Sequence, residues 1–120
     1  MKIASPTGSL GEKIAAEYLR KQGYKILEQN FSKRWGEIDI IAIDQDTLVF
    51  IEVKTRTSNA FGSPLEAITP WKLKTLTRTL QFYKATHRSL PDSLRIDAVA
   101  ILLSGREVES IELVKNISGY

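Results

Sequence analysis

Two carboxylates and a lysine occupy neighbouring apolar runs of the chain, at a spacing that suits metal-assisted chemistry. Asp39 stands in the first run, and Glu52 and Lys54 stand in the second. The polar residues 44–47 separate the runs and predict the turn of a β-hairpin. Such a hairpin would bring the carboxylates of its two strands together. Carboxylates bind Mg²⁺, and a neighbouring ammonium group stabilises negative charge that develops in a reaction.

The length of the hairpin loop decides whether these side chains meet. With a loop of two or four residues, Asp39 lies opposite Glu52, and Glu37 lies opposite Lys54. All four side chains then share one face of the sheet. A three-residue loop would place Asp39 and Glu52 on opposite faces, and no site would form.

Two facing carboxylates within apolar strands repel each other and are costly to remove from water unless a cation compensates them. Mg²⁺ or Mn²⁺ bound by Asp39 and Glu52 would supply that charge, polarise a scissile phosphate and lower the pKa of a bound water. Lys54 would orient this water and stabilise the developing charge. In the alternative interpretation, Glu37 joins these three residues in a partly solvated cluster of salt bridges.

Hydrophobic periodicity and turn residues predict the elements that position the hairpin. The predicted helices span residues 9–22 and, after the N-terminal signal Thr69-Pro70, residues up to about 87. The predicted strands span residues 24–31, 37–43, 48–54, 94–103 and 107–114, with a turn at Ser104-Gly105 and loops at 35–36 and 56–63. The order αβββαββ indicates an α/β fold, a mixed β-sheet flanked by helices, with the polar last strand at an edge.

The second predicted helix lies in a segment of one charge sign. No Asp or Glu occurs between residues 67 and 91, and the net charge of the chain is +3. Lys74, Arg78 and Arg88 fall on the side of this helix opposite its apolar stripe, and Arg56 continues the Glu52–Lys54 face into a loop. These four residues are candidate contacts to nucleic acid. The alternative for the helical ones is an ordinary solvated surface.

Several further residues have two interpretations each. Glu12 could complete a capping box with Ser9 or lean towards the metal from its helix. Asp97 could be a carboxylate near the site, but a partnership with Arg95 is favoured. His87 is expected to cap the second helix. The aromatic side chains expected in the core rather than on base-stacking surfaces are Trp71 and Tyr83.

The composition fits one ordinary globular domain of 120 residues, with 42% hydrophobic and 26% charged residues. The chain has no cysteine, which excludes disulfides, thiolate nucleophiles and cysteine-based zinc sites. Neither a signal peptide nor a membrane-spanning run is visible, so a cytoplasmic protein is expected.

Short motifs along nearly the whole chain resemble the bacterial YraN family. They are Gly11-Glu12, Gly23-Tyr24, Asn30-Phe31, Gly36-Glu-Ile-Asp39, Val49-Phe-Ile-Glu-Val-Lys-Thr-Arg56 and Arg95-Ile-Asp97. The family is similar to a minimal PD-(D/E)XK nuclease, with a layout like that of archaeal Holliday-junction resolvases. The resemblance implies a single domain over residues 1–120 with a restriction-endonuclease-like fold.

The resemblance also implies roles for individual residues. Asp39, Glu52 and Lys54 match the metal-binding and catalytic positions of the superfamily, and Glu12 matches its helical glutamate. Ile38 departs from the superfamily pattern, which has a proline there. That proline is not a ligand, so the departure leaves the expected chemistry intact.

Three functions follow as expectations. The first is a Mg²⁺- or Mn²⁺-dependent endonuclease acting on DNA, with branched or structured DNA implied by the likeness to junction resolvases. The second is a non-catalytic nucleic-acid-binding module, and the third is a protein-interaction domain in DNA processing. Symmetric cleavage of two strands would suit a homodimer.

Overall fold

A computed structural model describes residues 6–33, 36–57, 65 and 68–117 of the chain. Its elements are α1 (Pro6–Lys21), β1 (Lys25–Lys33), β2 (Gly36–Asp44), β3 (Thr47–Arg56), α2 (Pro70–Thr86), β4 (Ser93–Ser104) and β5 (Glu107–Val114). The predicted order αβββαββ and the α/β class are therefore confirmed. The ends of the elements differ from the predicted ones by up to three residues, and the last turn lies at Gly105-Arg106 rather than one residue earlier.

The strands form one five-stranded sheet in the order β1-β2-β3-β4-β5. Neighbouring strands are antiparallel except β3 and β4, which run parallel. Parallel neighbours need a crossover connection, and α2 lies within the segment that provides it. The mixed sheet and the edge position of polar β5 agree with the predictions.

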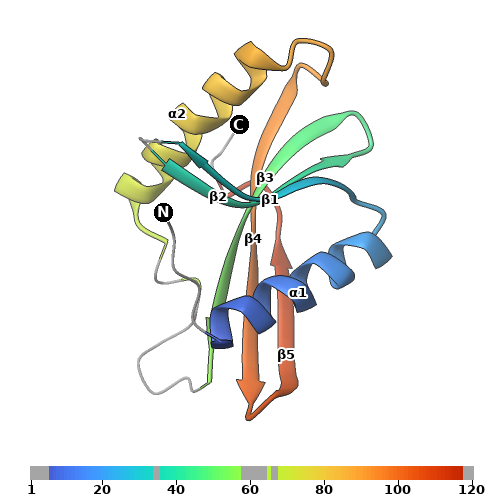
Figure 1. The fold of residues 1–120 in the computed structure, drawn as a ribbon, viewed down its shortest axis with the longest axis vertical. Coiled ribbons are helices and arrows are strands. Elements are labelled where there is room, and N and C mark those ends of the chain that lie inside the picture. The colour runs from blue at the N-terminus through green and yellow to red at the C-terminus, as the bar shows by residue number, and fades with distance from the viewer. Residues whose placement is uncertain (1–5, 34–35, 58–64, 66–67, 118–120) are drawn as a thin grey trace.

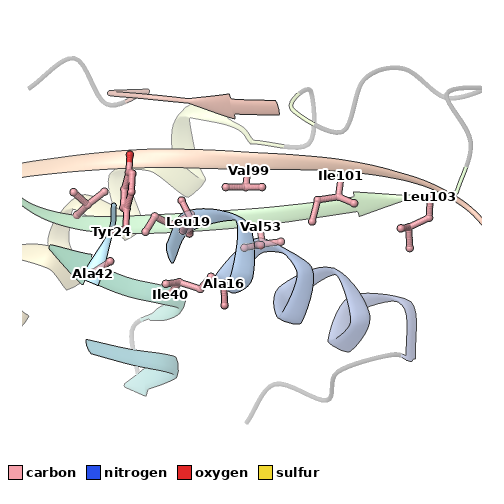
Figure 2. Close-up of a cluster of buried hydrophobic side chains, with 12 residues drawn as sticks. Ala16, Leu19, Tyr24, Ile40, Ala42, Val53, Val99, Ile101 and Leu103 are labelled. Carbon is pink, nitrogen blue, oxygen red and sulfur yellow. The ribbon is translucent and has the colours of Figure 1, made fainter. Parts of the chain in front are cut away.

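The two helices cover different faces of the sheet (Figure 1). Ala15, Ala16 and Leu19 of α1 pack on one face, against a cluster that includes Ile40 and Val53 (Figure 2). On the other face, the buried side of α2 packs against Leu48, Phe50 and their neighbours. Successive residues of β3 alternate between these clusters, as expected for a central strand with both faces covered.

Glycine allows close packing at the start of α1. A Cβ atom on Gly11 would lie 1.9 Å from Oγ1 of Thr55, near the end of β3. A second close approach joins β2 to α2, where a Cβ atom on Gly36 would lie 2.4 Å from Oγ1 of Thr79. Each glycine therefore lets a helix approach the part of the sheet that carries the predicted site.

The ends of the helices test three capping predictions. Thr69 caps α2 by accepting a 3.1 Å hydrogen bond from the Lys72 amide, with Pro70 at the helix start, and His87 caps the other end. These predictions are confirmed. The capping box at Ser9 is wrong, because α1 already begins at Pro6 and Ser9 lies inside it.

The hairpin turn has the even length that the site requires. Residues 45–46 form a two-residue turn, with Gln45 at a positive φ of 54°. Pairing runs from Asp44–Thr47 at the turn to Ile40–Ile51.

Of the predicted loop residues, Trp35 and Ser58–Ser63 lie outside the described residues. No helix in the described part of the chain is long and apolar enough to cross a membrane.

Candidate metal site

Glu52 and Lys54 project from β3 on the face that α2 covers. Leu48 and Phe50 belong to the core cluster beneath α2, and side chains two residues apart on a strand share a face. Lys54 Nζ lies 3.2 Å from Glu52 Oε1. The predicted neighbourhood of these two side chains is therefore present.

Asp39 meets β3 in a different way from the predicted one. The β2–β3 ladder ends at Ile40–Ile51, so Asp39–Glu52 and Glu37–Lys54 are not ladder pairs. Beyond this point the Asp39 carboxylate takes the place of a backbone acceptor. The Val53 amide donates a 2.8 Å hydrogen bond to Asp39 Oδ2. Asp39 is thereby fixed beside the backbone that carries Glu52.

The Glu52 carboxylate is buried among charges of both signs. Its residue is 4% exposed, and Asp39 is 3% exposed. Burial raises the pKa of Glu52, and the negative charge of Asp39 raises it further, while Lys72 and Lys54 oppose the shift. Asp39 is held at the amide of the residue after Glu52, so the two negative charges lie near each other in a poorly solvated place.

Lys72 lies beside the candidate site, which was not predicted from the sequence. Its ammonium nitrogen lies 3.9 Å from Glu52 Oε1. Lys72 stands four residues before Leu76 and eight before Leu80, both buried, so it belongs to the inward stripe of α2. This spacing was visible in the sequence and sets Lys72 apart from the outward-facing Lys74.

Glu12 lies in a cleft between α1 and strands β1 and β2. The residue is 8% exposed, and the cleft has a volume of about 550 Å³. Glu37 lines the same cleft, together with Lys13 and Arg20 of the helix. Across residues 6–33, 36–57, 65 and 68–117, no three Asp, Glu or His side chains lie close enough to share one ion. The part of Glu12 as a third ligand stays a prediction.

The donor set at Asp39 and Glu52 suits a hard divalent cation. Mg²⁺ keeps several waters and needs only one or two protein carboxylates, with phosphate oxygens filling other positions. Two buried carboxylates that repel each other gain from a cation between them. The residues present therefore fit Mg²⁺ or Mn²⁺ bound by two carboxylates rather than a site enclosed by protein ligands.

The residues predicted to contact nucleic acid lie at the surface. Arg56, Lys74, Arg78 and Arg88 are all exposed, the last three on or just after α2. Whether they bind nucleic acid stays a prediction. Trp71 was predicted to lie in the core. This prediction is wrong, because Trp71 is 73% exposed.

Tyr83 is buried, as predicted. Its ring packs edge-on against Phe31 and Phe50, with centroid distances of 5.2 and 5.7 Å. Its hydroxyl donates a 2.7 Å hydrogen bond to Glu28. It belongs to the inward side of α2, whereas Trp71 does not.

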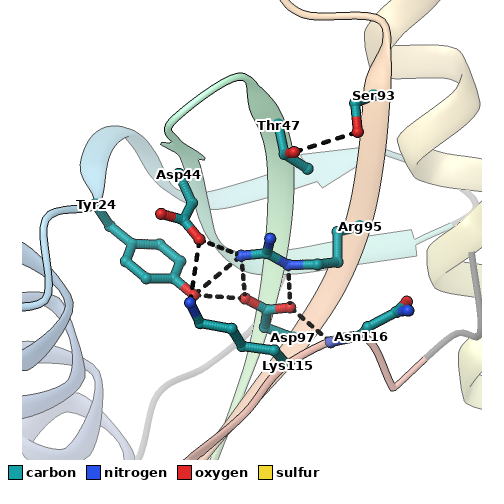
Figure 3. A network of polar contacts seen from close by, with 8 residues as sticks. All are labelled: Tyr24, Asp44, Thr47, Ser93, Arg95, Asp97, Lys115 and Asn116. Carbon is teal, nitrogen blue, oxygen red and sulfur yellow. Dashed lines mark hydrogen bonds and ion pairs between the residues drawn. The ribbon is translucent and has the colours of Figure 1, made fainter.

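Asp97 is fully buried in a network that joins distant parts of the chain (Figure 3). Arg95 Nε donates to Asp97 Oδ1 at 2.8 Å, and the Tyr24 hydroxyl donates to Asp97 Oδ2 at 2.7 Å. Arg95 also pairs with Asp44 at 2.6 Å, and the Asn116 amide donates to Asp97 at 2.9 Å. The favoured interpretation of Asp97 as a partner of Arg95 is confirmed.

This network lies on the other face of the sheet from Glu52. Asp97 is the β4 neighbour of Ile51, which packs on the α1 side, and Tyr24 belongs to the same cluster. The network therefore joins the end of β2, β4 and the residues after β5, on the other face of the sheet from the candidate ligand Glu52.

Comparison with known proteins places these residues in a family. The model of the Uncharacterised protein family UPF0102 matches residues 11–101. The chain belongs to this family. UPF0102 is the YraN family that the sequence motifs resemble. The matched region includes Glu12, Asp39, Glu52 and Lys54.

Relatives in the UPF0102 family match most of the chain. A UPF0102 protein of Syntrophomonas wolfei is 50% identical over 97 residues, covering 80% of this chain and 84% of its own. One from Syntrophus aciditrophicus is 47% identical over 110 residues, covering 92% and 86%. One from Clostridium botulinum is 46% identical over 113 residues, covering 91% and 90%. The similarity therefore extends over at least four fifths of each of these proteins.

Proposed function

We propose that this UPF0102 protein is a metal-dependent endonuclease that hydrolyses phosphodiester bonds in DNA. The observation that carries the proposal is the geometry around Glu52. A buried carboxylate stands 3.2 Å from the Lys54 ammonium and close enough to the Asp39 carboxylate for its pKa to rise. Two carboxylates and a lysine in this arrangement suit the hydrolysis of a phosphodiester.

In this mechanism Asp39 and Glu52 would hold Mg²⁺ or Mn²⁺. When bound, the ion polarises the phosphate and lowers the pKa of a coordinated water. The Val53 amide keeps Asp39 oriented by its 2.8 Å hydrogen bond. Lys54 places a positive charge where the phosphate gains negative charge, and Lys72 adds a second ammonium beside Glu52.

Metal binding tests the first half of the proposal. Titration calorimetry with Mn²⁺ should detect a site in the wild type that is lost in Asp39→Asn and in Glu52→Gln. Both substitutions remove charge but keep shape and a hydrogen-bond acceptor. Asp46→Asn, in the exposed hairpin turn, is the matched control and should bind as the wild type does. Equal binding by all four proteins would overturn the proposed ligands.

Cleavage tests the second half. Linear, flapped and four-way DNA would be incubated with Mn²⁺ and either the wild type or Lys54→Ala, with Lys25→Ala on the exposed surface as control. We expect the wild type and Lys25→Ala to cut, with structured DNA preferred, and Lys54→Ala to lose about 100-fold or more in rate. Equal rates for Lys54→Ala and the wild type would assign the cleavage to a contaminant.

A second candidate is a nucleic-acid-binding module that does not cleave. The observation that favours it is the presence of two lysines already beside Glu52, since they neutralise the carboxylate without a metal ion. DNA binding without cleavage in any divalent metal, together with unchanged binding in Asp39→Asn, would favour this module over the nuclease.

A further inference from the structure

Trp71 is a large aromatic side chain left in solvent at the start of α2. It is 73% exposed, whereas Tyr83 of the same helix is 2% exposed and packed in the core. Its position in the first turn is fixed by the Thr69 cap, and the Thr75 hydroxyl donates to the Trp71 carbonyl at 3.1 Å. The indole is therefore held on a rigid element.

Two cations share the exposed ridge of α2 with Trp71. Lys74 and Arg78 stand three and seven residues after it and are both exposed. At 3.6 residues per turn and about 1.5 Å of rise per residue, they lie on the same side of the helix, about 4.5 and 10.5 Å further along its axis. The helix contains no acidic residue to pair with them. An aromatic surface followed by cations is the arrangement that binds a single nucleic-acid strand.

The ridge starts at the same end of α2 as Lys72, which contacts the candidate metal site. Lys72 is the next residue after Trp71, and its ammonium lies 3.9 Å from Glu52 Oε1. Because Lys72 faces inward and Trp71 faces solvent, a strand on the ridge would reach the carboxylates by passing around the N-terminal end of α2. That end carries the positive pole of the helix dipole, with no acidic residue in the first turn.

We propose that Trp71, Lys74 and Arg78 form a track for an unpaired DNA segment adjoining the cleavage site. Trp71 stacks on an unpaired base, and the two cations contact phosphates of the same strand. The inference rests on the proposed nuclease function and adds its substrate class, DNA with a single-stranded portion. In duplex DNA the bases are stacked on each other, so their faces are closed to the indole.

The test measures binding without cleavage, in EDTA. The probe is a fluorescent oligothymidylate of about ten to fifteen nucleotides, compared with an abasic strand of equal length and with duplex DNA. Trp71→Ala should weaken binding of the oligothymidylate by about 5- to 150-fold and leave binding of the abasic strand unchanged. Trp71→Phe keeps an aromatic face and should therefore retain most of the wild-type affinity for the oligothymidylate.

Two further measurements separate stacking from charge. Lys74→Ala should weaken the binding of both single strands. It should also reduce the steepness of the plot of log binding constant against log salt concentration by about 0.7, for one lost phosphate contact. Arg106→Ala, an exposed cation in the β4–β5 turn, is the control and should change neither quantity. In a Trp35→Phe background Trp71 is the only tryptophan, so quenching of its fluorescence by oligothymidylate reports directly on stacking.

Equal binding of oligothymidylate by Trp71→Ala and the wild type would overturn the proposed track. So would a Trp71→Ala variant that loses as much affinity for the abasic strand as for the oligothymidylate. Tighter binding of duplex than of single strand would overturn it as well. Circular dichroism checks that the variants fold. Failure of the nuclease proposal is distinguishable, because it would appear as absent metal binding or cleavage while Trp71-dependent binding in EDTA persists.

Discussion

The Val53 amide donates a 2.8 Å hydrogen bond to the Asp39 carboxylate where strands β2 and β3 cease to pair. One side chain thus does two things at this point of the sheet. It satisfies a buried amide that the partner strand no longer reaches, and it presents its carboxylate near Glu52. The contribution of Asp39 to stability can therefore be measured apart from the metal binding that we propose for it.

Asp39→Ala and Asp39→Asn should differ in stability. Alanine leaves the buried Val53 amide without an acceptor, which costs about 1–3 kcal/mol. Asparagine keeps an acceptor at the same place and should lose less of the free energy of unfolding. Urea denaturation of both variants measures the difference. If alanine is as stable as asparagine, the hydrogen bond to Val53 does not support the fold.

Lys72→Met should separate the binding of metal from the binding of phosphate. The ammonium beside Glu52 repels a cation and attracts an anion, so its removal should leave Mn²⁺ affinity equal to or higher than that of the wild type. Cleavage of DNA should fall by about tenfold, because a positive charge near the phosphate is lost. Calorimetry and cleavage rates check the two effects. Weaker metal binding in Lys72→Met would show that Lys72 orients Glu52 instead.

Gly11→Ala should destabilise the protein, although alanine normally favours a helix. In an open position the change would stabilise by about 0.5–1 kcal/mol. Here the new Cβ would lie 1.9 Å from Thr55 Oγ1, and overpacking of this kind costs about 1–3 kcal/mol. Thermal denaturation gives the sign of the effect. An increase in stability would mean that α1 shifts freely away from β3.

The Asp44–Arg95 pair should make stability depend on pH in the acid range. Although burial alone raises the pKa of Asp44, the hydrogen bond from Arg95 and the charge of Lys115 lower it more, so the net shift is downward. A carboxyl group with a lowered pKa stabilises the fold above its unfolded pKa, near 3.9. That stability is lost as the pH falls through the folded pKa.

Asp44→Asn should therefore cost about 1–3 kcal/mol at neutral pH, and the difference from the wild type should shrink below about pH 4. Urea denaturation at several pH values measures this change. A difference that stays constant with pH would exclude the charge of Asp44 as its cause. Asp46→Asn, in the exposed turn, serves as the control.

The sequence predicted those features that depend on local spacing. The short turn within residues 44–47, of two or four residues as predicted, and the Thr69 cap follow from residues within a few positions of each other. The end of the β2–β3 ladder could not be predicted in this way, because it depends on how the strands diverge in three dimensions. Trp71 was predicted to lie in the core from its residue type alone. Its position along α2 instead puts it on the same exposed side of the helix as Lys74.

The parallel pairing of β3 with β4 has a consequence for the order of folding. The β2–β3 hairpin closes a two-residue loop, and hairpins form within about 1–10 μs. Lys72 reaches Glu52 only after the long crossover containing α2 has been laid across the sheet, which is slower because non-local contacts carry a larger loop-closure entropy. We therefore expect the carboxylates to assemble first. In a growing chain, the two carboxylates that we propose as metal ligands would therefore come together before the lysine from α2 arrives.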